Sequence, residues 1–196
     1  TKTPVVKARP SPVGEGLQVL IYALDQPNLF AQICSFFERT SLSIAEAKIY
    51  TTTSGYALDT FQVLDPTRAL GEYRDIIAYV EHELTAQLQQ SGPLPPPLRG
   101  RVSRRVRSFP MVPEVSIRPD ERGNAWYLSF NAGDRPGLLS SVARVLVDYG
   151  ISVQTAKINT LGERAEDSFV VTGEALRETR KVIRLERDLI AQLEIS

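Results

Sequence analysis

The 196-residue sequence is poor in the residue types on which redox and metal chemistry depend. It contains one cysteine, one histidine, one methionine and one tryptophan. The single cysteine, Cys34, excludes an intrachain disulfide, and the single histidine leaves few ligands for a zinc or other transition-metal site. Lys plus Arg and Asp plus Glu number 23 each, so the formal net charge is zero. A neutral chain lacks the excess positive charge on which nucleic-acid binding depends, so we expect no nucleic-acid partner.

Long apolar runs are also missing. No stretch approaches the ~20 apolar residues of a membrane span, and residues 1–16 lack the apolar core of a signal peptide. We therefore expect a cytoplasmic protein that does not bind membranes. The sequence begins with Thr1 instead of Met and runs directly into a strand-like segment, so we also expect it to be a piece of a longer protein.

An internal repeat organises the chain. When residues 4–51 are laid over residues 113–160 at a constant offset of 109, 14 of 48 positions are identical. One residue is then lost, and Asp-Thr-Phe at 59–61 matches Asp-Ser-Phe at 167–169 at an offset of 108. A hairpin tip tolerates a one-residue deletion, whereas a strand does not. The repeat therefore predicts two copies of one module.

Each copy predicts the same order of elements. Two strands around a glycine turn come first, at 5–9 with 17–24 and at 115–118 with 126–131. An Asp-x-Pro helix start and an amphipathic helix follow, then two β segments and a second amphipathic helix. The β segments are 42–52 with 56–64, and 151–161 with 167–172. This order predicts an α+β fold of two tandem ferredoxin-like modules, each an antiparallel four-stranded sheet with two helices on one face.

A Pro-rich and Arg-rich stretch separates the copies. Four prolines between residues 91 and 100 exclude a helix and favour an extended, stiff spacer. The arginines of this stretch are Arg99, Arg101, Arg104, Arg105 and Arg107. We interpret them as a solvated linker in preference to a docking patch for an acidic partner. The predicted organisation is a first repeat at 1–91, a connector at 92–111 and a second repeat at 112–196.

Catalytic and metal-binding patterns are weak throughout. His82 lies between Glu81 and Glu83 in a predicted helix, where an exposed charged face is the expected state. Cys34 falls on the apolar side of a predicted helix, where a buried and inert thiol is expected. The carboxylates at 163–167 fall in a predicted hairpin turn, where solvent keeps their pKa values alike. We therefore predict no catalytic residue, no metal site and no cofactor in this chain.

The remaining candidate is a helix-start loop that occurs twice. It reads Asp-Gln-Pro-Asn-Leu at 25–29 and Asp-Arg-Pro-Gly-Leu at 134–138. Free backbone N–H groups and the positive end of the helix dipole meet at such a loop, so a carboxylate could bind there. Gly137 would allow a ligand to approach the backbone closely, whereas Asn28 offers a side-chain amide. Asp and Pro also start many helices that bind nothing, so this alternative stays open.

The second copy resembles the ACT domain, a small-molecule sensing module, in three motifs. These are Asp-Arg-Pro-Gly-Leu-Leu at 134–139, Gly-Ile-x-Val at 150–153 and Ala-Lys-Ile at 156–158. More specifically, the string at 156–169 is similar to the last ACT repeat of bacterial PII uridylyltransferase/uridylyl-removing enzymes. The strings at 25–31 and 59–66 are similar to their penultimate repeat. The resemblance covers nearly the whole chain.

The resemblance implies a regulatory role. Members of this family modify the PII signal protein according to nitrogen supply, with magnesium and separate catalytic domains, and their tandem C-terminal ACT domains sense glutamine. On this basis glutamine is the expected effector, and the parent chain's catalytic domains, the PII protein and a second copy paired through ACT sheets are the expected partners. The ligand-binding residues carried over are Asp25, Asn28, Leu29, Asp134, Gly137 and Leu138. Two departures matter: Asn28 replaces the usual glycine, and little sequence remains after the second helix for the strand that ends a common ACT unit.

An alternative from another class stays open. The chain could be a stand-alone ACT-type regulatory protein that acts through protein–protein contacts. A nucleotidyltransferase domain encoded upstream distinguishes the regulatory region of an enzyme from this alternative.

Overall fold

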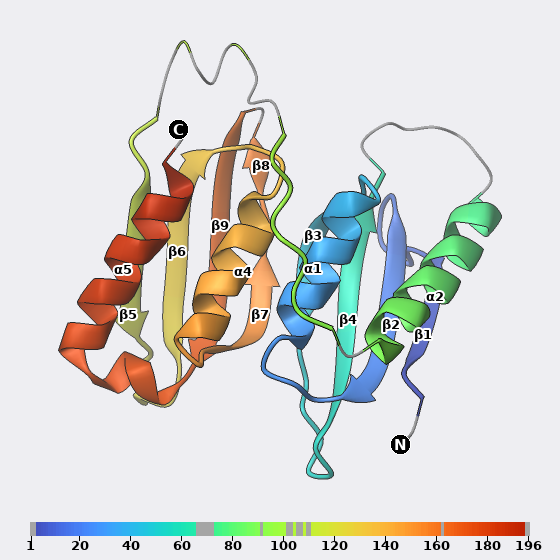
Figure 1. The fold of residues 1–196 in the computed structure, drawn as a ribbon, viewed down its shortest axis with the longest axis horizontal. Helices are drawn as coiled ribbons and strands as arrows, with labels where there is room; N and C mark the ends of the chain where they lie inside the picture. Colours follow the sequence, from blue (N-terminus) through green and yellow to red (C-terminus); the bar gives the residue numbers. More distant parts are fainter. Residues whose placement is uncertain are drawn as a thin grey trace. The chain divides into compact units, whose positions relative to one another are not determined.

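The computed structural model describes residues 3–65, 73–90, 92–100, 104, 108, 111–161 and 163–194. The chain divides into two compact units, 1–95 and 96–196, which we call module 1 and module 2. The division falls between Pro95 and Pro96, inside the stretch predicted as a connector. Figure 1 labels the elements of both modules.

Module 1 contains an antiparallel sheet in the order β1-β2-β4-β3. Its strands are β1 (Val5–Pro10), β2 (Leu17–Leu24), β3 (Ser43–Lys48) and β4 (Tyr56–Leu64), and its helices are α1 (Leu29–Arg39) and α2 (Tyr73–Gln89). The first hairpin pairs Val6 with Ile21, and β4 then adds to β2 with Ile21 opposite Asp59. The hairpin prediction is confirmed, and β1 occupies the sheet edge beside β2.

Module 2 repeats this plan in the order β5-β6-β9-β7. Its strands are β5 (Glu114–Pro119), β6 (Trp126–Gly133), β7 (Ser152–Lys157), β8 (Thr160–Leu161) and β9 (Arg164–Thr172). Its helices are α4 (Leu138–Asp148), the short η1 (Glu174–Arg177) and α5 (Thr179–Leu193). Phe130 pairs with Asp167, as Ile21 pairs with Asp59, so the two sheets share one register. The short β8 pairs with β9 and adds a fifth strand to the predicted four.

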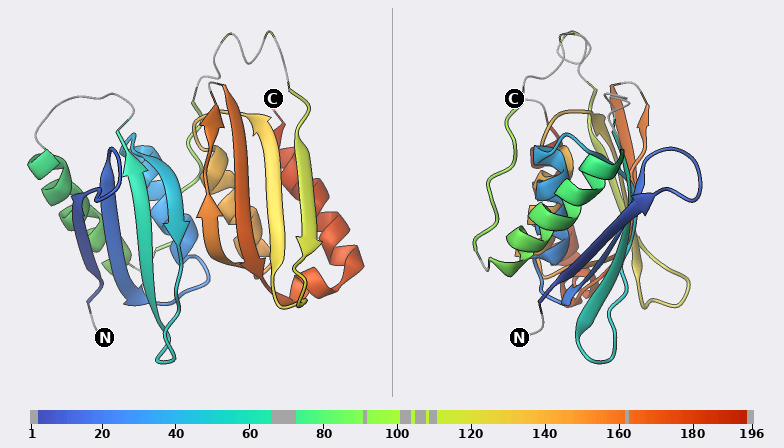
Figure 2. Two further views of the ribbon diagram at one scale, coloured as in Figure 1. Left: turned by 180° about the vertical axis from the view of Figure 1, so that it is seen from behind. Right: turned by 90° about the vertical axis from the view of Figure 1, so that its right-hand side faces the viewer.

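The strands explain why the core lies on one side of each sheet. Residues of β2 alternate between buried and more exposed along all eight positions, because neighbouring side chains of a strand point to opposite faces. The buried set packs beneath two amphipathic helices, and Figure 2 shows the helices of each module on one face of its sheet. Phe37 and Phe61 lie at the centre of module 1, with ring centroids 5.9 Å apart. The predicted fold class is therefore confirmed.

Two details differ from the sequence-based expectation. The predicted segment 151–161 is split into β7 and β8, and β9 begins at Arg164, three residues earlier than predicted. The stripe predicted for the second helix of module 1 includes Leu70, which lies outside the described residues, and Tyr73, which is 46% exposed. Among the described helices, none combines the length and the apolar content that crossing a membrane requires.

Candidate functional site

The two predicted ligand loops occupy equivalent places in the two modules. Loop 1 (residues 25–29) joins β2 to α1, and loop 2 (residues 134–138) joins β6 to α4. The backbone N–H of Asp25 donates to the Gly55 carbonyl at 3.0 Å, and that of Asp134 donates to the Glu163 carbonyl at 2.8 Å. Both contacts tie the loop to the hairpin turn that precedes β4 or β9. The fold therefore holds each set of three predicted residues in one short loop.

The helix starts leave backbone donors available, as the sequence predicted. Asn28 and Gly137 are the N-cap residues, and no described side chain caps either helix. The carboxylate of Asp25 instead accepts a hydrogen bond from the Thr51 hydroxyl at 3.2 Å. In α1 the N–H of Leu29 donates to the Gln26 carbonyl, which leaves the N–H groups of Phe30 and Ala31 without an acceptor inside the helix. These two N–H groups and the helix dipole form an anion-binding end.

Leu29 and Leu138 serve the core. Their side chains are 5% and 4% exposed and anchor the loops beneath the helices. They could contact a ligand through the backbone alone. The polar groups of the loops are therefore the ones that a ligand would meet.

The two loops differ at the position occupied by Asn28 and Gly137. Asn28 has φ −101°, whereas Gly137 has φ +82°, a left-handed conformation that glycine adopts at little cost. A Cβ atom on Gly137 would collide with the carbonyl oxygen of Leu98 and lie 3.0 Å from the Leu98 nitrogen. A Cβ atom on Gly100 would likewise collide with the Pro136 ring. The connector therefore packs against loop 2, and the space beside Gly137 is filled by the chain itself.

A buried aspartate accompanies each loop, and sequence reasoning missed both. Asp59 in β4 is 1% exposed and Asp167 in β9 is 3% exposed. Burial raises the pKa of Asp59 to about 7; the hydrogen bond from the Tyr50 backbone lowers it in part, and the negative charge of Asp25 raises it. Burial also raises the pKa of Asp167 to about 7. The hydrogen bond from the Asn159 backbone lowers this pKa in part, and the negative charge of Asp134 raises it.

Each buried carboxyl group accepts a backbone N–H from the equivalent residue of its module, Tyr50 for Asp59 and Asn159 for Asp167. The Asn159 backbone N–H donates to Oδ1 of Asp167 at 3.1 Å. Oδ1 of Asp59 has no solvent contact and no hydrogen-bond partner among the described residues. An unsatisfied buried carboxylate oxygen is costly, so its presence in a native fold calls for an explanation.

The prediction of a solvated turn at 162–167 is wrong for Asp167. Strand β9 already begins at Arg164, and its alternation directs Ala165, Asp167 and Phe169 towards the helices. The charged residue in an otherwise apolar alternation, repeated at Asp59, was the signal that could have revealed this pair. The one-residue deletion in the repeat falls just before Asp167, and for this reason the segment was predicted to be a turn.

Comparison with known proteins places this geometry in a family. Residues 126–185 match the ACT domain family. Module 2 contains an ACT domain. Module 1 repeats its topology, register and loop, so the chain consists of two ferredoxin-like modules of ACT type.

Close relatives of this chain are larger proteins, of which it matches one part. The chain is 60% identical to a bifunctional uridylyltransferase/uridylyl-removing enzyme of Cupriavidus pinatubonensis, over 98% of the chain and 22% of the relative. Relatives of the same description in Ralstonia nicotianae and Chromobacterium violaceum are each 54% identical, over 100% and 98% of the chain. The chain spans about a fifth of the length of the curated relatives it matches.

Cysteine and histidine occupy ordinary positions in the described part of the chain. Cys34 is buried, as predicted, and His82 is exposed with Nδ1 3.0 Å from Glu83. The described residues contain no group of three or more His, Cys, Asp or Glu that could hold a metal ion.

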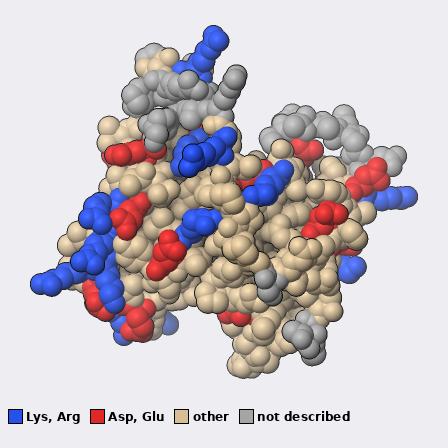
Figure 3. Space-filling view, viewed as in Figure 1, with Lys and Arg blue, Asp and Glu red and all other residues tan. Residues whose placement is uncertain are grey.

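Charged groups of both signs share the surface. Figure 3 shows Lys and Arg side chains gathered over α5, next to acidic ones. Lys181 pairs with Glu178 at 2.7 Å, and Arg187 pairs with Asp188 at 3.2 Å. Mixed charge of this kind is typical of a solvated helix face.

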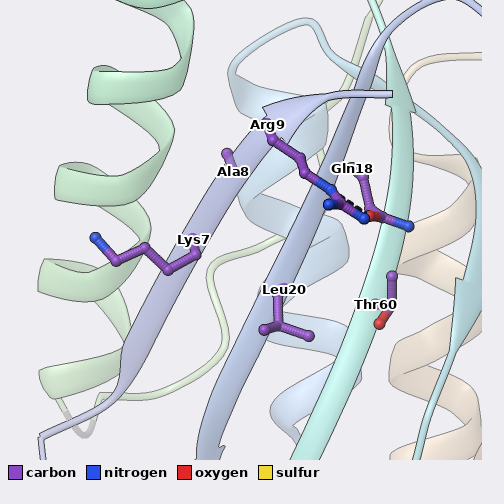
Figure 4. A pocket seen from close by; sticks show the side chains of 6 residues that line it. All are labelled: Lys7, Ala8, Arg9, Gln18, Leu20 and Thr60. Carbon is purple, nitrogen blue, oxygen red and sulfur yellow. Dashed lines mark hydrogen bonds between the residues drawn. The ribbon is translucent and has the colours of Figure 1, made fainter. Parts of the chain in front are cut away.

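The open faces of the two ACT sheets differ strongly. In module 1 the apolar residues Leu20, Leu24 and Leu58 are 41%, 45% and 38% exposed. Their counterparts in module 2 are Ser129, Gly133 and Glu166. A hollow of about 440 Å³ on the module 1 face is lined by Leu20 and by polar and charged side chains, as Figure 4 shows. The side chains drawn there are Lys7, Ala8, Arg9, Gln18, Leu20 and Thr60.

Proposed function

We propose that this chain is the glutamine-sensing region of a bifunctional uridylyltransferase/uridylyl-removing enzyme that controls nitrogen assimilation in the cytoplasm. The observation that carries the proposal is the doubled helix-start loop in a tandem ACT region whose relatives bear that description. Catalysis then belongs to other domains of the parent chain, with their magnesium, and the PII signal protein is their substrate. No catalytic role falls to the present residues.

The chemistry of loops 1 and 2 supports an amino-acid effector. An amino acid carries a carboxylate, and the N–H groups at the start of α1 match that charge. The amide of Asn28 adds a side chain that can both donate and accept hydrogen bonds, as the glutamine side chain requires. The ligand-binding residues that we propose are Asp25, Asn28 and Leu29 in loop 1. Asp134, Gly137 and Leu138 are the equivalents in loop 2.

Regulation requires that glutamine bind two arrangements of the protein unequally. We propose that loop 2 is the element with two states, because the connector backbone at Leu98 lies where a ligand would approach Gly137 and its release would be the second state. A ligand on loop 2 must displace the connector, so binding there and release of the connector are coupled. Loop 1 has Asn28 at the position of Gly137, so we do not expect the same coupling to the connector there.

The parent enzyme provides the test. The rate of uridylyl transfer to PII is measured with and without glutamine, in the full-length enzyme and in one that lacks the segment corresponding to residues 1–196. We expect the truncated enzyme to keep transferase activity and lose its response to glutamine. A normal glutamine response in the truncated enzyme would show that the effector binds elsewhere.

A second candidate function rests on the open face of module 1. Exposed leucines on a sheet face are typical of a surface that contacts another protein. A stand-alone ACT-type regulator, or a homodimer through ACT sheets, would use this face. The upstream gene sequence separates the stand-alone regulator from the enzyme region: a nucleotidyltransferase domain encoded in frame rules out the former.

A further inference from the structure

Two carboxyl groups lie at loop 1, although an anion-binding loop needs none. Asp25 is exposed at the start of the loop, and Asp59 lies behind it with an unpartnered Oδ1. The two carboxyl groups accept hydrogen bonds from adjacent residues: the Tyr50 backbone N–H donates to Asp59, and the Thr51 hydroxyl donates to Asp25. The two carboxyl groups are therefore neighbours, beside the start of α1.

We propose that Asp25 and Asp59 hold the α-ammonium group of an amino acid whose carboxylate binds the N–H groups of Phe30 and Ala31. The inference rests on the proposed function and extends it, because it names the groups that recognise the ammonium half of the ligand. Module 1 is then selective for amino acids with a free ammonium group.

An ammonium group accounts for two features of loop 1: the unpartnered Oδ1 of Asp59 and the placement of two carboxyl groups side by side. It has three N–H donors and no acceptor, so it can satisfy the orphaned Oδ1 of Asp59 and an oxygen of Asp25 together. Charge-assisted hydrogen bonds of this type are about twice as strong as neutral ones, which offsets the burial of the carboxylate. The positive ligand charge also removes the repulsion between Asp25 and Asp59, which in its absence raises the pKa of Asp59.

Two observations assign the site to module 1. In module 2 the Leu98 backbone lies against Gly137, whereas in module 1 Asp59 keeps one buried oxygen, Oδ1, without a hydrogen-bond partner among the described residues. In module 1 the position equivalent to Gly137 is occupied by Asn28, so loop 1 lacks the glycine against which the connector packs in module 2. Residues 25–27 are exposed, and they must move outward on binding because Oδ1 of Asp59 has no solvent contact.

The test is a calorimetric titration of the 196-residue chain at pH 7.5 with three probes. L-Glutamine carries both charges, N-acetyl-L-glutamine lacks the ammonium group, and glutamine α-amide lacks the carboxylate. We expect the wild-type chain to bind L-glutamine and to bind each of the other two probes at least tenfold more weakly. Loss with the α-amide alone would contradict the ammonium site.

The matched variants are Asp59→Asn and Asp167→Asn, which remove one buried carboxylate from each module. We expect Asp59→Asn to weaken glutamine binding at least tenfold and Asp167→Asn to change it less than threefold. Far-UV circular dichroism and thermal unfolding report whether each variant is folded, and Asp25→Asn, at an exposed position, repeats the test with less risk to folding. Unchanged affinity in both Asp59→Asn and Asp25→Asn overturns the inference, as does a loss confined to Asp167→Asn.

The outcomes separate this inference from the function on which it rests. If the wild-type chain binds none of the common amino acids, both fail. If it binds glutamine equally well without Asp59 and Asp25, only the ammonium site fails. If it binds a different amino acid in a manner that depends on Asp59, the ammonium site stands and the assignment of glutamine fails.

Discussion

Asp59 and Asp167 make the stability of this chain depend on pH in an unusual direction. Burial is the main cause that raises the pKa of each from 3.8 to about 7. A carboxyl group whose pKa is higher in the folded protein binds its proton more tightly there. Its contribution to stability is greatest below pH 3.8 and decreases as the pH rises towards 7, opposite to the usual surface carboxylate.

We therefore predict that the free energy of unfolding falls between pH 4 and pH 7. A rise of about three pKa units corresponds to roughly 4 kcal/mol for each group, as an upper value. Asp134, whose pKa is also raised by burial, acts in the same direction. Urea unfolding at several pH values measures the slope, and Asp59→Asn and Asp167→Asn should each flatten it. A wild-type stability that increases over this range would contradict the burial of these charges.

The contrast between Asp25 and Asp59 shows what the sequence can predict about a site. Asp25 and Asp134 belong to a local motif, Asp-x-Pro before a helix, and their position in a loop follows from neighbouring residues. Asp59 and Asp167 join the site only because β4 and β9 pair with β2 and β6 in one particular register. That register depends on contacts distant in sequence, so local patterns could not place these carboxyl groups beside the loops.

At the scale of elements, the connector is the part that the sequence described least well. Its prolines predict an extended segment, and residues 92–100 indeed contain no helix or strand. Nothing in that composition predicts where an extended segment packs, because it has no apolar periodicity. The contacts of Leu98 with Gly137 and of Gly100 with Pro136 were visible only in three dimensions.

This packing predicts different costs for two glycine substitutions. Gly137 and Gly123 both have positive φ, +82° and +68°, but a Cβ atom meets the connector only at Gly137. Gly123→Ala should cost about 1 kcal/mol of unfolding free energy through backbone strain alone. Gly137→Ala should cost roughly 1–3 kcal/mol more, because it also overpacks the contact with Leu98.

Urea unfolding of the two variants at one pH measures the difference. Gly123→Ala serves as the control for strain, since open space surrounds that position. Equal destabilisation would mean that the connector does not rest on loop 2 in solution. The helices and strands themselves, in contrast, followed from period and turn residues, because each module's amphipathic pattern agrees with its fold.

At the scale of the whole molecule, the repeat itself supplies a control for surface function. Leu20 and Leu58 on the open face of module 1 correspond to Ser129 and Glu166 on that of module 2. Both faces share one strand order and one register, so the fold alone does not explain the difference between them. The exposed apolar face is the surface through which we expect two copies to associate.

We predict that Leu20→Ser with Leu58→Glu, which copies module 2 onto module 1, weakens self-association at least tenfold. Analytical ultracentrifugation over a range of concentrations measures the dissociation constant. Tyr127→Ser removes an exposed aromatic residue from the open face of module 2 and should leave association unchanged. An identical dissociation constant in the wild-type chain and the double variant would exclude this face.

The central claim is that loop 1 of this ACT pair binds an amino acid at the start of α1. The most direct measurement is an NMR titration of the isotope-labelled 196-residue chain with L-glutamine, following the backbone N–H signals. We predict saturable shifts that are largest at Phe30 and Ala31 and extend to Tyr50, Thr51 and Asp59. Saturable shifts elsewhere that leave Phe30 and Ala31 unmoved, or no shift at any glutamine concentration, would contradict the account.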